Sequence, residues 1–338
     1  MQKIYIVASN VKQGGAGELL SYLLEYLYSS YKDIPIKVYV DHSLNLTSKG
    51  NIEIINQHSN YEKIYLFSKS LENVLYFGNL PPLRKSKNAM VYFHNTYLLM
   101  NFKTLIKQKF KLFLKFFPQQ IYIKFFIRNV DLVGCQTNSV KLAYKKKYGF
   151  NNISLFPFYK QCNLKKVNKN VIEYDFCYIS LDYPHKNHHL LFDAMEILAN
   201  RGYDINLIVT INKENQSLIS RINDINQIGN VEIINIGILS KDRICDIYQA
   251  SRCLCFPSKT ESFGLPLIEA ASQGLDIIAA DLDYVYEVVR PSAVFDPYDA
   301  NDLVNKMVAY LEGKLQSSEC LIENKIDYLI NNLLKKEV

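Results

Sequence analysis

Two glutamates, Glu261 and Glu269, flank the run S-F-G-L-P in a segment that follows an apolar, strand-like stretch. Gly264 allows a close backbone approach and Pro266 suits the first position of a helix, so the pattern predicts a helix that begins here with free backbone N–H groups. Such a helix end attracts phosphate. A carboxylate beside it can accept two hydrogen bonds from a ribose diol. The segment therefore predicts a sugar-nucleotide site, and the alternative is an ordinary helix start with acidic first-turn residues.

Strand-like and helix-like segments, which would position these residues, alternate along the chain. Residues 3–8 form an apolar run that leads into Gly14-Gly15-Ala16-Gly17, followed by leucines at helical spacing, which is typical of strand, glycine loop and helix. Alternation of this kind predicts a parallel sheet covered by helices, with ligands at the carboxyl ends of the strands. Further strands are expected at 36–40, 63–67, 90–93 and 132–136, and, after a polar linker at 150–170, at 176–180, 205–211, 231–236, 253–256 and 277–280.

The length of the chain fits two domains of this α/β type. It has 338 residues, of which 49% are hydrophobic, enough to fill two cores. We predict two Rossmann-like domains, residues 1–160 and residues 161–338, that face each other across a cleft. The last helix could pack back on the N-terminal domain.

The motif around the two glutamates resembles that of glycosyltransferase family 4, the retaining enzymes of the GT-B fold. The family signature is two glutamates separated by seven residues around an S-F-G-L-P core, and Glu261 and Glu269 match it. The resemblance covers most of the chain in order. It implies that the N-terminal domain lies on the acceptor side and that the C-terminal domain binds the nucleotide sugar.

The same resemblance implies roles for individual residues. Glu269 would hold the nucleotide ribose, and Glu261 would lie by the donor sugar, as would His94, which directly follows a strand. Lys186 matches the lysine of the diphosphate-binding element and would stabilise the leaving group, although the arginine that often precedes it by five residues is Leu181 here. The catalytic set is thus Glu261, Lys186 and His94, and the donor-binding set is Gly15, Gly17, Lys186, Gly237, Ser262, Phe263, Gly264, Leu265 and Glu269.

The implied function is retaining transfer of a hexose from a nucleoside diphosphate sugar to a saccharide acceptor, lipid-linked, in surface polysaccharide synthesis. The motif offers no carboxylate for a double displacement. The resemblance instead implies same-face attack, in which the departing phosphate takes the acceptor proton. Two alternatives stay open: a sugar-nucleotide epimerase of similar fold, which would convert donor without an acceptor, and a noncatalytic sugar-nucleotide-binding scaffold protein.

No metal or other cofactor is expected. The seven cysteines include no CxxC pair, which argues against a zinc site. Asp281-Leu282-Asp283 has the form of a DxD metal motif, but the resemblance implies that a helix end and basic side chains replace the divalent ion, so we interpret it as a loop. Thr137 and Ser139 follow a strand and are expected to be polar residues that line the cleft.

The charge of the chain is unevenly distributed. Residues 1–160 carry 22 Lys and Arg against 8 Asp and Glu, whereas the remainder carries 17 against 25. The first half therefore favours anionic partners. No nucleic-acid-binding module is visible, so nucleic acid is not an expected partner.

Part of this positive charge lies on a predicted amphipathic helix in residues 102–128. Lysines recur every fourth residue beside an aromatic face, until Pro118 is expected to interrupt the helix. The pattern is typical of a helix that lies on anionic lipid; the alternative is a helix packed on its own domain. The lysines are Lys103, Lys107, Lys111 and Lys115, with Lys109 inside the apolar arc of Phe102, Ile106, Phe110, Phe113 and Phe117.

The sequence has no run near the roughly 18 apolar residues of a membrane span and no signal-peptide pattern. We therefore expect a cytoplasmic protein, peripheral at the inner face of the cytoplasmic membrane. Its expected partners are a nucleoside diphosphate sugar, a saccharide or lipid-linked acceptor and an anionic membrane surface.

Overall fold

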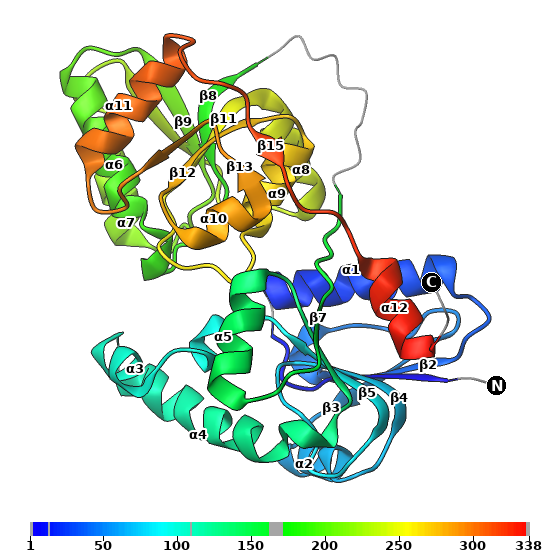
Figure 1. Cartoon of the computed structure of the whole chain (residues 1–338). Helices are drawn as coiled ribbons and strands as arrows, with labels where there is room; N and C mark the ends of the chain where they lie inside the picture. The colour runs from blue at the N-terminus through cyan, green and yellow to red at the C-terminus, as the bar shows by residue number, and fades with distance from the viewer. Residues whose placement is uncertain (1–2, 13, 109, 162–171, 336–338) are drawn as a thin grey trace. The chain divides into compact units, whose positions relative to one another are not determined.

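The computed structural model describes residues 3–12, 14–108, 110–161 and 172–335. The chain divides into two compact units (Figure 1). The first unit comprises residues 1–160 and 323–338, and the second comprises residues 161–322. Residues 323–338 thus belong to the first unit, whereas the sequence-based division placed them in the second domain.

A parallel sheet forms the centre of the first unit. Within the described residues it has seven strands in the order β3-β2-β1-β4-β5-β6-β7. The connections from β1 to β2 and from β3 to β4 run in opposite directions along the sheet, which places α1 and α2 on opposite faces. Helix α12 covers the same face as α1, and α4 and α5 cover the same face as α2 (Figure 1). The bounds are β1 (Ile4–Ala8), α1 (Gly15–Ser30), β2 (Ile36–Asp41), β3 (Ile52–Gln57), α2 (Asn60–Phe67), β4 (Glu72–Phe77), β5 (Lys87–Phe93), α3 (Phe102–Gln108), α4 (Phe110–Phe126), β6 (Leu132–Cys135), α5 (Asn138–Tyr148), β7 (Ile153–Leu155) and α12 (Ile326–Leu334).

Residues 63–67, expected to form a strand, form the second half of helix α2 instead. The Ser59 side chain accepts a hydrogen bond from the Glu62 backbone N–H, and the Glu62 carboxylate accepts from the Ser59 N–H. This reciprocal cap satisfies N–H groups that a helix start would otherwise leave unpaired. A short apolar run is ambiguous between strand and helix, and the cap decides in favour of the helix.

The expected interruption at Pro118 is also wrong, because α4 continues through Pro118 to Phe126. Phe116 and Ile123 are buried against the sheet, before and after the proline. The Gln120 side chain donates to the Tyr97 and Met100 carbonyls at 3.2 and 3.0 Å. Tertiary packing therefore compensates for the helix hydrogen bond that proline removes. Residue 109 lies outside the described residues.

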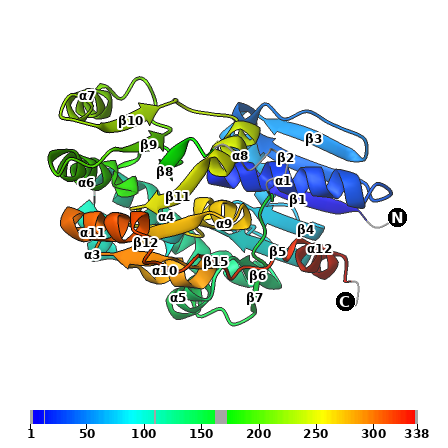
Figure 2. The same cartoon turned by 90° about the horizontal axis from the view of Figure 1, so that it is seen from above.

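The second unit contains a second parallel sheet, with six strands in the order β10-β9-β8-β11-β12-β14 within the described residues. Figure 2 shows α6, α7 and α11 along one face and α8, α9 and α10 on the other. This confirms the predicted α/β class. The bounds are β8 (Tyr174–Tyr178), α6 (His188–Asn200), β9 (Ile205–Val209), α7 (Gln216–Ile225), β10 (Val231–Asn235), α8 (Lys241–Ala250), β11 (Ser251–Phe256), α9 (Leu265–Ser272), β12 (Asp276–Ala280), α10 (Asp283–Val288), β13 (Val289–Arg290), β14 (Ala293–Phe295), α11 (Ala300–Leu311) and β15 (Glu319–Cys320).

Helix α12 packs on the first sheet although it follows the whole second unit in the chain. The Lys325 N–H donates to the Pro157 carbonyl at 2.7 Å, and the Asn88 side chain donates to the Leu333 carbonyl. Leu329 and Ile330 are almost fully buried. The first unit is therefore assembled from two separate segments of the chain.

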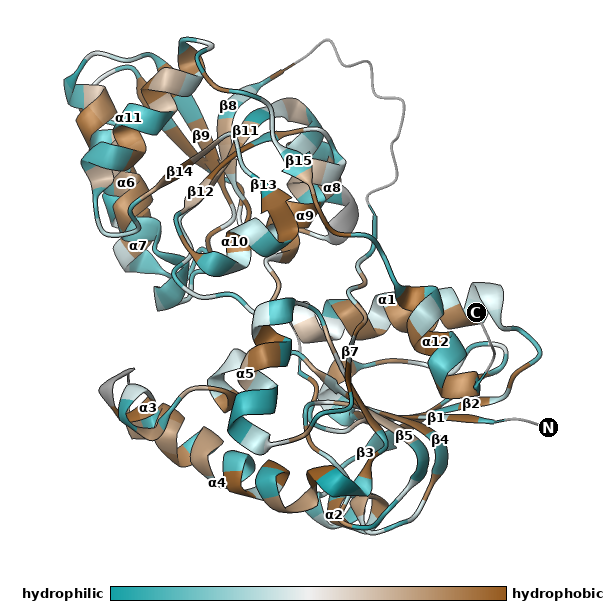
Figure 3. Ribbon diagram, in the orientation of Figure 1, coloured by the Kyte–Doolittle hydropathy of each residue, from teal (hydrophilic) through white to brown (hydrophobic). Residues whose placement is uncertain are grey.

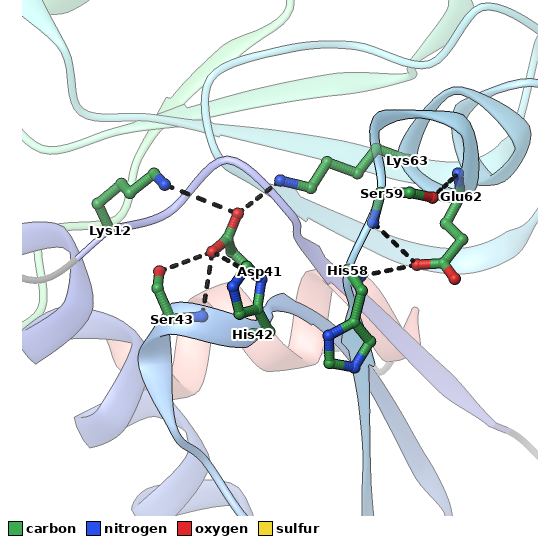
Figure 4. A network of polar contacts seen from close by, with 8 residues as sticks. All are labelled: Lys12, Asp41, His42, Ser43, His58, Ser59, Glu62 and Lys63. Atoms are coloured by element: carbon green, nitrogen blue, oxygen red, sulfur yellow. Dashed lines mark hydrogen bonds and ion pairs between the residues drawn. The ribbon is translucent and has the colours of Figure 1, made fainter.

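A buried carboxylate organises the carboxyl ends of β1, β2 and β3 (Figure 4). Asp41 accepts hydrogen bonds from the backbone N–H and hydroxyl of Ser43 and from the Lys63 ammonium, at 3.1, 2.6 and 2.5 Å. The Lys12 ammonium lies 3.7 Å from the same carboxylate. Burial alone would raise the pKa of Asp41, but these hydrogen bonds outweigh burial and hold its pKa well below the usual range.

We expect Asp41→Asn to reduce the stability of the first unit by about 1–3 kcal/mol at pH 7, because it leaves Lys63 without its anionic partner. Asp41 has a lower pKa in the folded than in the unfolded chain, so its contribution is present above about pH 4 and is lost as pH falls through the folded value. Urea unfolding, with hydrogen exchange in β2 as the local probe, should show a deficit at pH 7 that shrinks below pH 4. Glu53→Gln, which removes an exposed ion pair with Lys37, is the control and should change little; an equal effect of both variants would contradict the assignment.

Candidate active site

The loop between β11 and α9 has the conformation that the motif predicts. Gly264 has φ 70° and is the residue before α9, and no side chain caps this helix start. A Cβ at Gly264 would lie 3.1 Å from the Leu267 side chain, so the left-handed φ and the close contact both favour glycine. Pro266 lies in the first turn. The start of α9 therefore has no side-chain cap, which suits a phosphate, although Pro266 has no N–H and the Leu267 N–H donates to the Gly264 carbonyl at 2.9 Å.

Lys186 and Glu261 form an ion pair beside this loop. The Lys186 ammonium lies 2.5 Å from a Glu261 carboxylate oxygen, and each side chain is 13% exposed. Lys186 ends a short 3-10 helix (Pro184–Lys186), and its Nζ lies 5.9 Å from the centre of the Phe256 ring. The structure thus brings together two residues that are 75 positions apart in the sequence.

Two tyrosines that the sequence did not indicate hold the loops that carry this pair. The Tyr178 hydroxyl donates to the Lys186 carbonyl at 2.7 Å, and the Tyr284 hydroxyl donates to the Ser258 carbonyl at 2.6 Å. The Lys259 N–H also donates to the His185 carbonyl at 2.8 Å, which ties the two loops directly. These contacts fix the backbone on both sides of the ion pair before any ligand is bound.

The histidines of this loop are neutral at physiological pH. Burial lowers the pKa of His188 to about 4, and burial together with the nearby Lys186 charge lowers the pKa of His185. Lys186 is therefore the cation of this loop. An ammonium has three donors, so Lys186 can keep Glu261 as a partner and still reach a phosphate oxygen.

Glu269 lies in the second turn of α9 and is only 6% exposed. The hydroxyl of the fully buried Tyr248, from α8, donates towards its carboxylate at 3.5 Å. Burial, and next the Glu269 charge, raise the pKa of Tyr248 well above its usual value, so the phenol stays protonated as a donor. Tyr248 is a further residue of the site that no local sequence signal indicates.

The remaining donor-binding candidates of the second unit lie at element ends. Gly237 follows β10 with φ 74°, and its N–H donates to the Asn235 side chain at 3.1 Å. Ser262 and the buried Phe263 lie in the loop before α9, and Leu265 is its first residue. Their contacts with a nucleotide stay predictions.

In the first unit, the glycine loop before α1 is shorter than predicted, because α1 begins at Gly15. Gly14, with φ 108°, precedes α1, while Gly15 and Gly17 lie inside its first turn. A Cβ at Gly17 would lie 3.0 Å from the Lys12 carbonyl oxygen, so the preceding loop passes too closely for a larger residue. The glycines therefore serve a close loop-to-helix turn, and α1 begins without a side-chain cap.

His94 directly follows β5, as expected, and is held by Asn79, which the sequence did not indicate. The His94 backbone N–H donates to Asn79 Oδ1 at 2.8 Å, and Asn79 Nδ2 lies 3.3 Å from His94 Nε2. The imidazole packs against the rings of Phe77 and Tyr92. Burial lowers the pKa of His94 to about 4, so the ring is neutral at pH 7.

Two other candidate groups have structural roles. Thr137 caps α5, since its hydroxyl accepts from the Val140 N–H, and it also lies 3.2 Å from the Ser139 hydroxyl. Asp281 accepts a hydrogen bond from Tyr286 at 2.7 Å, and Asp283 begins α10. In the described parts of the chain, no group of three or more His, Cys, Asp or Glu side chains is arranged to hold a metal ion.

Residues 160–327 match the family described as "Glycosyl transferases group 1". The chain belongs to the group 1 glycosyl transferases. The chain is similar to the O-antigen chain mannosyltransferase RfbU of Salmonella typhimurium, with 22% identity over 244 residues, which cover 69% of the chain and 65% of RfbU. It is also 31% identical over 128 residues to the serotype-specific mannosyltransferase WbdA of Escherichia coli, covering 37% of the chain and 16% of WbdA.

Solved structures support the fold of the chain. A sucrose-phosphate synthase from Thermosynechococcus elongatus has a TM-score of 0.69 at 14% identity, with 99% of this chain and 94% of the other covered. HepE of Anabaena, solved in complex with UDP and glucose, has a TM-score of 0.65 at 14% identity, with 99% and 97% covered. The two α/β units thus have the GT-B fold. Among the described helices, none has the length and apolar character that a bilayer span requires.

Proposed function

We propose that this glycosyltransferase moves a hexose from a nucleoside diphosphate sugar to a saccharide acceptor, with retention at the anomeric carbon, in the synthesis of a surface polysaccharide. The observation that carries the proposal is the Lys186–Glu261 ion pair beside the uncapped start of α9. This combination offers a cation and backbone N–H groups to a diphosphate. The mannosyltransferase relatives and the UDP complex of HepE support a nucleotide sugar as donor.

The leaving nucleoside diphosphate gains negative charge as the bond between its terminal phosphate oxygen and the anomeric carbon of the sugar breaks. Lys186 and the start of α9 stabilise that charge more in the transition state than in the ground state, which accelerates the reaction. Glu261 orients the Lys186 ammonium, and Tyr178 fixes the Lys186 backbone. No metal ion is required in this scheme.

Retention follows from attack on the face that the leaving group vacates. The departing phosphate takes the proton of the acceptor hydroxyl, so no covalent sugar intermediate forms. The Glu261 carboxylate is paired with the Lys186 ammonium. This pairing suits a role in which Glu261 positions the cation, rather than one in which it attacks the sugar as a nucleophile. Glu269 holds the ribose of the donor, with Tyr248 orienting its carboxylate.

A panel that crosses uridine and guanosine diphosphates with glucose, galactose and mannose tests the proposal. One donor should raise the unfolding temperature, because a ligand that binds only the folded state stabilises it. That donor should be hydrolysed slowly alone and consumed faster with a saccharide acceptor, giving a product of unchanged anomeric configuration. Conversion of the donor to an isomer without any acceptor would identify an epimerase, and binding without turnover under all conditions would identify a scaffold.

We further propose that the enzyme acts at a membrane on a lipid-linked acceptor, because the helices on one face of the first sheet expose apolar side chains and lysines. Large apolar side chains are exposed there on α2, α3, α4 and α5, and no Asp or Glu occurs in α3 or α4, although α2 carries Glu62. Hydrophobic and hydrophilic segments alternate along α4 (Figure 3). Exposed apolar side chains among unopposed lysines suit an anionic bilayer. The apolar residues are Tyr61, Ile64, Tyr65, Phe102, Ile106, Phe110, Leu114, Ile121, Phe125 and Leu142.

Charge reversal of Lys103, Lys111 and Lys115 to glutamate should weaken binding to vesicles of 30% phosphatidylserine by more than a hundredfold, since each lysine near the surface contributes about 1 kcal/mol. Sedimentation with vesicles at low salt measures this, and donor binding should be preserved. Reversal of Arg290, Lys306 and Lys314 in the second unit makes the same charge change and should have a much smaller effect. If the unaltered protein does not bind these vesicles at low salt, the membrane proposal fails and the acceptor is soluble.

A further inference from the structure

Three neighbouring strands of the first sheet end in buried polar side chains. Ser9 follows β1, Asp41 is the last residue of β2, Gln57 is the last residue of β3, and none of the three is more than 3% exposed. Asp41 and Gln57 are partners in the β2–β3 register. Register partners of parallel strands lie about 4.8 Å apart and direct their side chains to the same face of the sheet. Ligands of open α/β sheets bind at this carboxyl edge.

Two of these side chains have a buried oxygen that lacks a hydrogen-bond partner among the described residues. The two atoms are Ser9 Oγ and Gln57 Oε1. An amide oxygen only accepts, so it needs an O–H or N–H donor. A buried acceptor that stays unpaired costs free energy, which a hydroxyl group of a ligand would recover. Asp41, in contrast, is already hydrogen-bonded to Ser43 and Lys63.

This edge of the sheet is open to solvent on the side of Lys12 and His42, whose side chains are 72% and 57% exposed. The Lys12 ammonium and His42 Nδ1 each lie 3.7 Å from an Asp41 oxygen, which is longer than a hydrogen bond. The His42 ring also stacks on the exposed His58 ring, with 5.3 Å between the ring centres (Figure 4). The open side therefore offers an ammonium group and two ring faces to a ligand.

The fixed charges around this edge are balanced. Lys12 and Lys63 lie beside Asp41, and Glu62 accepts the His58 backbone N–H at 2.7 Å. Two lysines and two carboxylates leave no excess positive charge for a phosphate. A neutral sugar suits these groups better, because a hydroxyl group both donates and accepts hydrogen bonds.

The edge is displaced along the sheet from His94, the candidate of the reacting centre in the first unit. His94 follows β5, and the strand order β2-β1-β4-β5 places Asp41 three strand spacings away, roughly 14 Å. One sugar ring does not span this separation. A sugar bound at the edge is therefore not the one that reacts.

We propose that the carboxyl ends of β1, β2 and β3 form a subsite for an internal sugar of the saccharide acceptor, which then contains at least two sugars. Lys12 donates a hydrogen bond to one hydroxyl group of that sugar, and Gln57 Oε1 accepts one from another. The stacked His42 and His58 rings pack against the sugar ring, and Asp41 is a positioning residue for the Lys12 ammonium. That the bound sugar belongs to the acceptor rests on the proposed function.

Binding is tested by carbon-13 NMR of the histidine rings, assigned with His42→Gln and His58→Gln. The protein, saturated with nucleoside diphosphate, is titrated with mannobiose, maltose, lactose and inorganic phosphate. At least one disaccharide should shift both signals, and phosphate at equal ionic strength should shift neither. If no disaccharide shifts them, or if phosphate does, the inference is wrong.

Two variants test the contacts. Lys12→Met and Gln57→Leu should each weaken disaccharide binding by about tenfold or more. Lys32→Met, which removes an exposed lysine just beyond the other end of α1, is the control and should bind normally. Gln57→Leu should not lower the unfolding temperature of the free protein, because it removes an unpaired buried acceptor. A large loss of stability in this variant would show that Gln57 is structural and would contradict its place in the subsite.

Kinetics connect the subsite with the acceptor. A disaccharide acceptor should have a kcat/KM about tenfold or more above that of its monosaccharide, and Lys12→Met should abolish this advantage while leaving monosaccharide transfer and slow donor hydrolysis unchanged. An equal loss for both acceptor lengths would overturn the inference. Disaccharide binding at His42 and His58 without any sugar transfer would overturn the proposed function instead.

Discussion

Replacing Lys186 by alanine is expected to lower turnover by about a hundredfold or more, with a smaller loss in donor binding. The reason is that the leaving diphosphate gains charge in the transition state, where a preorganised cation contributes most. Initial rates over a range of donor concentrations would separate kcat from KM. Lys259→Ala, in the loop that contains Glu261, is the matched control and should retain near-normal turnover.

The Lys186–Glu261 pair complicates this experiment, because removing the lysine leaves a carboxylate that is only 13% exposed without its partner. The double variant Lys186→Ala, Glu261→Gln resolves the ambiguity. If Lys186 stabilises the leaving group, the double variant stays slow although its stability recovers. Near-normal turnover in the single variant would show that another cation performs this role.

Glu269→Ala is expected to weaken binding of the nucleoside diphosphate by about tenfold to a hundredfold. A buried carboxylate that accepts two hydrogen bonds from the ribose contributes roughly 1.5–3 kcal/mol. Calorimetry measures the affinity, and a thermal unfolding curve checks that the variant is folded. Tyr248→Phe should give a smaller loss in the same direction, because it removes only the hydroxyl that orients the carboxylate.

The control for this series is Glu312→Ala, which removes an exposed carboxylate paired with Lys314 at 2.7 Å in the second unit. It should leave nucleotide affinity unchanged. A folded Glu269→Ala variant with the affinity of the unaltered protein would remove Glu269 from the binding site and place the ribose elsewhere.

The fold class and most of the second sheet were predictable from local sequence signals. Five of the six described strands of the second sheet were expected within a few residues of their observed bounds, because each is an apolar run between polar segments. Strand β14 of that sheet and strands β3, β4 and β7 of the first sheet were not expected. The strand predicted at residues 63–67 was wrong because this apolar run is too short to distinguish a strand from a helix. The cap formed by Ser59 and Glu62 favours the helix more than the β-branched and aromatic residues of the run favour a strand.

The candidate site was predictable only in the part that one contiguous motif encodes. Glu261, Gly264 and Glu269 lie within nine positions of each other, so their spacing on a loop and a helix start can be read from the sequence. Tyr178, Tyr248 and Asn79 act through contacts that the tertiary fold creates, and a tyrosine or asparagine at a strand or helix end has no distinctive pattern. Their roles required the structure.

The two-segment construction of the first unit has a consequence for how the protein is made. A ribosome synthesises residues 1–160 first, yet α12, which completes that unit, emerges only after all of residues 161–322. Until then the surface beneath Leu329, Ile330 and Leu333 is uncovered, and a bare apolar surface on a nascent chain is prone to aggregation. The second unit is a single continuous segment, so all of it has been synthesised before the final helix of the first unit emerges. The unit that is synthesised first is thus the one that is completed last.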